Sequence, residues 1–329
     1  MITLRTPAIE VDVDDAHGAT IVRVADAQGR NALAHYDWET PQPAGRGLSY
    51  GNDDLDFHSS YRGGWQETFP NAGLPSIVNG VPLPFHGEAA TASWTIDSVS
   101  ETRCELHVPA RLPLVLRRTM ELDGVRPVLR ITGEVENVGE VPVDFVWGHH
   151  PAFPATPGAQ LDLPTGARIR PDVERAAGLR LEPTDWPRGI RENGESVDLS
   201  VVPDGQVHQL LYVDGLAEGW AAIRQPQPGV SVALAWDIQR HPYSWLWIMR
   251  GDPGFPFYGR ANMMAIEAQT AWPYDGLGGA RRRNMAHRIE PGETVRNWYT
   301  CALFENRSGA VTQVARNGEI RFAEESLGG

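Results

Sequence analysis

Short apolar runs, separated by glycine and proline, recur along most of the chain. Several alternate apolar with polar positions, as in Val128–Val135, which is the period of a half-buried strand. The helical pattern of apolar residues three and four apart is scarce, and its best window, Asp172–Leu181, is short. The pattern therefore predicts an all-β chain. The predicted strands include Ile9–Val13, Ala19–Val24, Thr91–Val99, Thr102–Val108, Leu114–Leu122, Val128–Val135, Val230–Asp237 and Trp245–Met249.

Turn residues between these runs favour antiparallel strands, because Asp-Gly and Asn-Gly pairs are typical of tight turns. Asn317-Gly318 predicts a C-terminal β-hairpin at about 309–323, since both central residues of a type I′ turn need positive φ. No internal repeat is present, and the turn-rich segment Pro154–Leu199 is interpreted as a long insertion. We expect a single domain over 1–329, a large antiparallel β-sandwich.

Charge and composition exclude several partners. The 329 residues carry a net charge of −13, which disfavours nucleic acid and anionic membranes because like charges repel. No apolar run is long enough for a membrane helix, and the first fifteen residues lack a secretory signal. Cys104 and Cys301 lie far apart in sequence, so with no signal we expect a cytoplasmic protein whose cysteines are reduced. We expect the protein to be a monomer or a homodimer.

The chain contains no lysine, so all 29 of its basic residues are arginine. Schiff-base chemistry on a lysine amine is therefore impossible, as is a Walker A phosphate loop. The pattern G-x-S-x-G does occur at Gly47–Gly51, but no strand precedes it and Asn52–Phe57 does not predict a helix. A serine esterase is therefore disfavoured.

A first polar cluster follows Tyr61. Glycines, which let a backbone approach a ligand, alternate there with side chains that can bind hydroxyl groups. These side chains are Arg62, Glu67, Asn71 and, a little later, His86. The alternative interpretation is a turn-rich surface loop.

A second cluster places His149 and His150 at the end of an apolar strand. Because strand side chains alternate, the two imidazoles should face opposite ways, so that one supports the core and the other is available for catalysis. Two adjacent histidines that point apart make a poor metal pair, and no zinc motif accompanies them, so we expect no metal and no other cofactor.

A third cluster contains Glu267 within an apolar stretch, where a carboxylate costs free energy unless it is paired or functional. Burial would raise its pKa towards the range of a useful base. An edge-strand glutamate that faces water is the alternative. Nearby, Tyr243, Trp245 and Trp247 share one strand face, which is more often core, although Trp247 is a candidate wall for a sugar.

Taken in order, these anchors resemble the aldose 1-epimerase, or galactose mutarotase-like, family. The resemblance covers roughly residues 18–300. It rests on the strand and turn at 18–29, His86-Gly87 with Trp94, His150-Pro151 with Phe153, and Glu267 with Thr270.

The resemblance implies a β-supersandwich that interconverts the α and β anomers of a free sugar without a cofactor. It implies His150 as general acid, Glu267 as general base, and His86 and Arg62 as substrate-binding residues. Asn71 and Trp247 are further candidates. The sequence does not place the family's substrate-binding aspartate, for which Asp214 and Asp237 are both candidates.

The sequence departs from the family at three places: Arg62 lacks the flanking Asn and Ile, Glu88 replaces a glycine, and Ala152 replaces an aromatic residue. Galactose is therefore not assured, and an acidic, phosphorylated or sulfonated sugar stays open. Two other functions stay open as well, a non-catalytic carbohydrate-binding domain and a glycosidase or lyase on a related sandwich. A glycosidase usually needs two carboxylates across its bond.

Overall fold

The computed structural model describes residues 1–38, 51–307 and 309–323. Its larger sheet has ten antiparallel strands within those residues. In spatial order they are β1 (Ile2–Arg5), β2 (Ile9–Asp14), β3 (Thr20–Asp26), β4 (Trp65–Thr68), β12 (Gly148–Pro154), β22 (Asn262–Gln269), β21 (Tyr243–Arg250), β18 (Val207–Asp214), β14 (Arg168–Pro171) and β15 (Thr184–Asp185).

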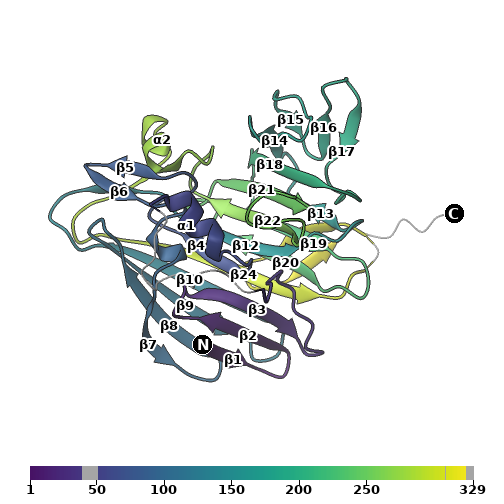
Figure 1. Ribbon diagram of the computed structural model, residues 1–329. Helices are drawn as coiled ribbons and strands as arrows, with labels where there is room; N and C mark the ends of the chain where they lie inside the picture. The colour runs from purple at the N-terminus through teal and green to yellow at the C-terminus, as the bar shows by residue number, and fades with distance from the viewer. Residues whose placement is uncertain (39–50, 308, 324–329) are drawn as a thin grey trace.

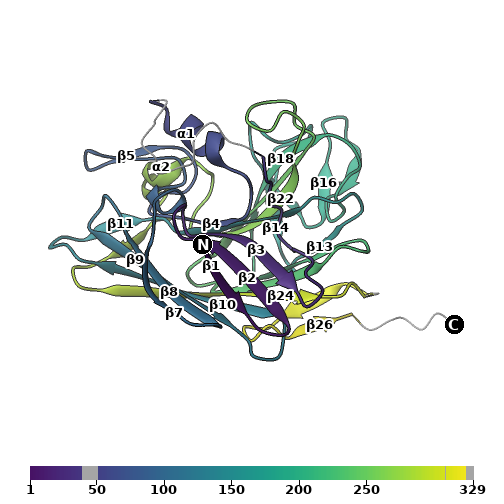
Figure 2. The ribbon, with the colours of Figure 1, turned by 60° about the horizontal axis from the view of Figure 1, so that its bottom comes forward.

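The second sheet has eight antiparallel strands in the described part of the chain. Their order is β13 (Gln160–Asp162), β19 (Trp220–Arg224), β20 (Ser231–Trp236), β24 (Thr294–Phe304), β10 (Val128–Asn137), β9 (Leu114–Leu122), β8 (Arg103–Pro109) and β7 (Thr95–Val99). Figures 1 and 2 show the two sheets as layers, with the ten-stranded sheet uppermost in Figure 2. The predicted all-β sandwich is confirmed.

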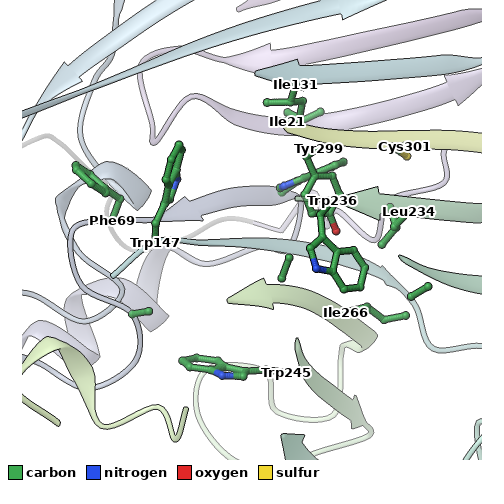
Figure 3. Packing of buried hydrophobic residues seen from close by; sticks show 14 of the residues in the cluster. Ile21, Phe69, Ile131, Trp147, Leu234, Trp236, Trp245, Ile266, Tyr299 and Cys301 are labelled. Atoms are coloured by element: carbon green, nitrogen blue, oxygen red, sulfur yellow. The ribbon is translucent and has the colours of Figure 1, made fainter. Parts of the chain in front are cut away.

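Strand alternation buries one row of side chains from each sheet. In β9, buried and more exposed positions alternate from Leu114 to Leu122, as the sequence predicts. Figure 3 shows the core between the sheets, where Ile21 and Ile266 from one sheet approach Ile131 and Trp236 from the other. This packing closes one face of the ten-stranded sheet and leaves the other face for a site.

Strand ends differ from the prediction in one region. The predicted strand Thr91–Val99 begins only at Thr95, because the short 3-10 helix η1 (Glu88–Ala90) precedes it. The indole of Trp94 donates to the carbonyl of Ala89 at 3.0 Å, which holds the chain in a turn.

A helix occurs where the sequence analysis expected none. Helix α1 (Asp53–Ser60) begins at Asn52, whose side chain accepts hydrogen bonds from the amides of Asp54 and Leu55. Such a cap and the acidic first turn stabilise a short helix without a regular apolar stripe. The prediction for Asn52–Phe57 was therefore wrong, while Ser49 lies outside the described residues.

The window Asp172–Leu181, which has the best helical pattern in the sequence, is not helical, in agreement with the all-β prediction. The Asp172 side chain accepts hydrogen bonds from the amides of Glu174 and Arg175, each at 3.0 Å, and so forms a turn. The predicted insertion at 154–199 contains β13, β14 and β15, which add edge strands to both sheets, and the pair β16 (Arg188–Ile190) and β17 (Ser196–Asp198).

The remaining elements lie around the sandwich. They are α2 (Gly276–Arg282) and three two-stranded pairs, β5 (Ser76–Val78) with β6 (Val81–Leu83), β11 (Val143–Phe145) with β23 (His287–Ile289), and β25 (Val311–Val314) with β26 (Ile320–Phe322). The last pair is the hairpin that Asn317-Gly318 predicts. Within the described residues, Cys104 and Cys301 are both buried and free of disulfides. No helix there is long and apolar enough to cross a bilayer.

Candidate active site

A cavity of about 220 Å³ lies on the face of the ten-stranded sheet that the second sheet leaves open. Helix α1 covers the same face in Figure 2. The cavity is lined by Asp54, Leu55, Phe57, His58, Tyr61, Phe85, His86, His150, Arg175, His208, Leu210, Trp245, Trp247, Asp252, Phe255, Pro256, Phe257, Glu267 and Tyr274.

Strand register brings the two candidate catalytic residues together. The pairs Gly148↔Gln269 and Ala152↔Ala265 place His150 of β12 opposite Glu267 of β22. Directly opposed residues of antiparallel strands project to the same face. The Nε2 atom of His150 accordingly lies 3.6 Å from Oε1 of Glu267.

The neighbouring His149 points to the other face of the sheet, as strand alternation predicts. Its Nδ1 accepts a hydrogen bond from the Trp65 indole at 3.3 Å, and its ring packs on Tyr299 in the core. Burial lowers the pKa of His149 to about 3. His149 is therefore a neutral core histidine.

Burial also shifts both members of the His150–Glu267 pair. It raises the pKa of Glu267 to about 8, against a smaller opposing effect of the hydrogen bond from Gln269. It lowers the pKa of His150 to about 4. Both shifts disfavour charge in a poorly solvated site. Near neutral pH both shifts favour the uncharged forms, a protonated Glu267 carboxyl beside a neutral His150 imidazole.

His86 presents a fixed donor beside this pair. Its Nδ1 accepts a hydrogen bond from the Gly73 amide at 3.1 Å, so Nε2 carries the proton. Burial lowers the pKa of His86 well below its usual value, which keeps the ring neutral. The backbone of His86 has φ +59°, a left-handed conformation that is costly for a residue with a side chain and recurs at functional sites.

Aromatic rings form the walls. The ring of Trp247 lies between His150 and His208, with centroid separations of 5.9 and 6.2 Å. Tyr61 lies edge-on to His150, and its hydroxyl is 3.4 Å from Nδ1. The other ring nitrogen of His150, Nε2, is the one that faces Glu267. Trp247 therefore forms part of the cavity wall.

The far end of the cavity holds polar groups that the sequence analysis missed. His208 Nδ1 lies 2.5 Å from Asp252, and His58 Nδ1 lies 2.9 Å from Asp54. Arg175 joins them, its guanidinium 4.8 Å from the ring centre of Tyr274. The turn on Asp172 aims Arg175 here, a local hydrogen bond that apolar periodicity does not reveal.

Two residues predicted to bind substrate, Arg62 and Asn71, do not line this cavity. Arg62 lines a separate cavity of about 10 Å³ with His17 and His35. Asn71 is fully buried, and its amide donates to the carbonyls of Leu74 and Pro84, each at 2.9 Å. Asn71 therefore holds loops together and has no free group for a sugar.

The other open candidates also lie outside the cavity. Glu67 is buried between the sheets, where it pairs with Arg118. Asp214 forms an ion pair with Arg170 at 2.7 Å, and Asp237 accepts a turn hydrogen bond from the amide of Gln239. In the part of the chain that the structure describes, no group of His, Cys, Asp or Glu side chains is arranged to hold a metal ion.

Comparison with known proteins supports the fold. No family model and no curated protein matches the chain. Among solved structures, a proposed aldose 1-epimerase from Escherichia coli K12 is 19% identical, with a TM-score of 0.60 over 92% of this chain and 98% of that chain. A proposed aldose 1-epimerase from Klebsiella pneumoniae is 14% identical, with a TM-score of 0.68 over 91% and 77%.

A galactose mutarotase-like protein from Lactobacillus casei is 17% identical, with a TM-score of 0.55 over 92% of this chain and all of that chain. At these identities the likeness concerns architecture rather than activity. The chain therefore has the antiparallel supersandwich fold of galactose mutarotase-like proteins.

Proposed function

We propose that this chain is an aldose 1-epimerase, which interconverts the α and β anomers of a free sugar. The observation that carries the proposal is the pair His150 and Glu267, buried side by side at 3.6 Å at the base of an open cavity. Anomer exchange needs two proton transfers at oxygens bonded to the same carbon. A donor and an acceptor at this separation suit that requirement.

Ring opening starts from the neutral pair. The Glu267 carboxyl gives its proton to the ring oxygen while Nε2 of His150 removes the proton of the C1 hydroxyl. The bond from C1 to the ring oxygen breaks, a C1 carbonyl forms, and the pair becomes imidazolium and carboxylate. The open aldehyde turns about C1–C2.

Ring closure then reverses the two roles. The Glu267 carboxylate removes the proton of the sugar hydroxyl that attacks C1, and the His150 imidazolium protonates the carbonyl oxygen. In this half-reaction His150 is the acid and Glu267 the base. The sequence resemblance assigns those roles to ring opening, so the neutral starting pair reverses the assignment for that step. The pair ends in its starting state, so no cofactor is consumed.

The rest of the cavity would orient the sugar. The Nε2–H of His86 is placed to donate to a hydroxyl near the pair, and the face of Trp247 offers a stacking surface. Arg175 and His208 would contact hydroxyls at the far end. These contacts supply the positioning that acid–base chemistry alone lacks.

Substitution of the pair tests the proposal. We expect Glu267→Gln and His150→Asn each to slow anomer exchange by about 10²–10⁴-fold, the usual worth of general acid–base catalysis. Exchange NMR across neutral, acidic and sulfonated hexoses measures the rate and the preferred substrate together. Circular dichroism shows whether the variants fold. Asp214 pairs with Arg170 and does not line the cavity, so Asp214→Asn is the matched control and should keep the wild-type rate.

Three results would contradict the proposal. Wild-type rates in either variant would remove that residue from the mechanism. Sugar binding by the wild type without faster exchange would favour the carbohydrate-binding alternative. New reducing ends released from oligosaccharides would favour a glycosidase or lyase.

A further inference from the structure

We infer that Gln269 is a positioning residue for Glu267. It holds one carboxyl oxygen so that the other alone faces His150 and the cavity. The inference rests on the proposed function for its catalytic meaning. The contact itself is a matter of geometry and is testable without turnover.

The two oxygens of Glu267 have different neighbours. Oε1 faces Nε2 of His150 at 3.6 Å, whereas Oε2 accepts a hydrogen bond from Nε2 of Gln269 at 3.0 Å. Oε1 of Gln269 in turn accepts from the hydroxyl of Thr68 at 3.4 Å. Gln269 is 1% exposed, so water does not compete for its amide. The carboxyl plane is therefore fixed from the side away from the cavity.

Gly148 provides the space for this arrangement. Register places it opposite both Thr68 and Gln269, so the Gln269 amide passes over its backbone to reach Thr68. A Cβ atom at 148 would lie 1.9 Å from Oε1 and 2.5 Å from Nε2 of Gln269. The φ of Gly148 is not positive, so its backbone does not itself require glycine. The close approach of the Gln269 amide explains why position 148 is a glycine.

The hydrogen bond also acts on proton affinity. A donor to a carboxylate favours its ionised form, so Gln269 opposes the rise that burial causes in the pKa of Glu267. The other titratable groups near Glu267 are His150 from β12, Tyr61 after α1 and Tyr299 from β24. Near neutral pH none of these is expected to carry charge, since burial lowers the pKa of His150 and raises the pKa of both phenols.

The test measures the carboxyl directly. Infrared difference spectra between each protein and its Glu267→Gln counterpart isolate the C=O stretch of the protonated carboxyl, and its pH titration gives the pKa of Glu267. We expect Gln269→Leu to raise that pKa by about one, the worth of one hydrogen bond to a charged group. The alkaline limb of the rate profile should move by the same amount.

Gly148→Ala provides a second route to the same contact, because it leaves Gln269 in place but displaces its amide. It should raise the pKa in the same direction. In the double variant Gly148→Ala with Gln269→Ala, the added methyl group should have little further effect, because the amide it displaces is gone. If Gly148→Ala fails to fold, Gln269→Leu and Gln269→Asn still decide the matter.

An unchanged pKa of Glu267 in Gln269→Leu would overturn the inference, as would fully additive effects in the double variant. A wild type that does not accelerate anomer exchange would instead refute the proposed function. The infrared titration would still report whether Gln269 holds the carboxyl.

Discussion

Glu67 and Glu267 are both fully buried carboxylates of the ten-stranded sheet, but they lie on opposite faces of it. Glu67 faces the second sheet, where it meets Arg118 at 3.4 Å and accepts a hydrogen bond from the Trp147 indole at 2.7 Å. Glu267 faces the cavity, with His150 and Gln269 as its neighbours.

The difference between them lies in partners and access rather than in burial. Burial raises the pKa of both carboxyls, but at Glu67 the charge of Arg118 and the Trp147 indole oppose the rise. A charged partner stabilises an anion, whereas the neutral imidazole beside Glu267 leaves a proton that can move. We therefore expect Glu67 to serve stability and Glu267 to serve chemistry.

The largest expected effect, a loss of stability, comes from removing the cationic partner of Glu67. Arg118→Met leaves the carboxyl of Glu67 buried without its cation, and also removes the guanidinium from the face of Trp94, 4.7 Å away. Removing one partner of a buried ion pair costs about 3–5 kcal/mol of unfolding free energy. Urea denaturation measures the loss. Glu267→Gln should show no such loss, and equal destabilisation of the two variants would erase the distinction.

The next prediction concerns pH. Below about pH 4 His150 is protonated and the pair lacks a base, while above about pH 8 Glu267 is ionised and the pair lacks an acid. The exchange rate should therefore be bell-shaped, falling about tenfold for each pH unit beyond either limb. Polarimetry across this range measures both limbs, and a flat profile between pH 3 and 9 would contradict the neutral pair.

Stability follows the same two groups with opposite signs. The pKa of His150 lies below its ordinary 6.5, so its contribution is complete above pH 6.5 and is lost as the pH falls through about 4. The pKa of Glu267 lies above its ordinary 4.5, so its contribution is complete below pH 4.5 and is lost as the pH rises through about 8.

The smallest expected effect is that of replacing Arg175, with Arg62 as the comparison. Arg175→Ala removes donors from the far end of the cavity and should raise KM about tenfold with a smaller change in kcat, a loss of about 1.4 kcal/mol. Arg62→Ala is the matched control, because Arg62 lines a different cavity. KM values from exchange kinetics measure both, and a larger effect of Arg62→Ala would restore the interpretation based on sequence.

Strand periodicity explains how much of this site could be predicted. Alternation separates His149 from His150, and a lone carboxylate in an apolar strand marks Glu267. Both rules depend on residues that are close in sequence. Pairing of β12 with β22, which brings these residues to 3.6 Å, is a long-range contact that local patterns do not contain.

The residues that the sequence analysis missed belong to irregular segments. Asp54 and His58 lie on a helix that depends on the Asn52 cap, and Arg175 lies on a turn that Asp172 makes. In both cases one polar side chain bonded to backbone amides sets the direction of the chain, which apolar periodicity does not register. Arg62 was favoured by its place in the sequence, although its side chain lies in another cavity.

The contact between Gly148 and Gln269 also constrains how this sequence can diverge. A lineage that first exchanges the glutamine for a smaller residue can afterwards tolerate an alanine at 148, whereas the reverse order passes through a protein with a steric clash beside its carboxyl. The two positions are therefore expected to change together among descendants. The glutamine is expected to be replaced first, because a Cβ atom on residue 148 would clash with its amide.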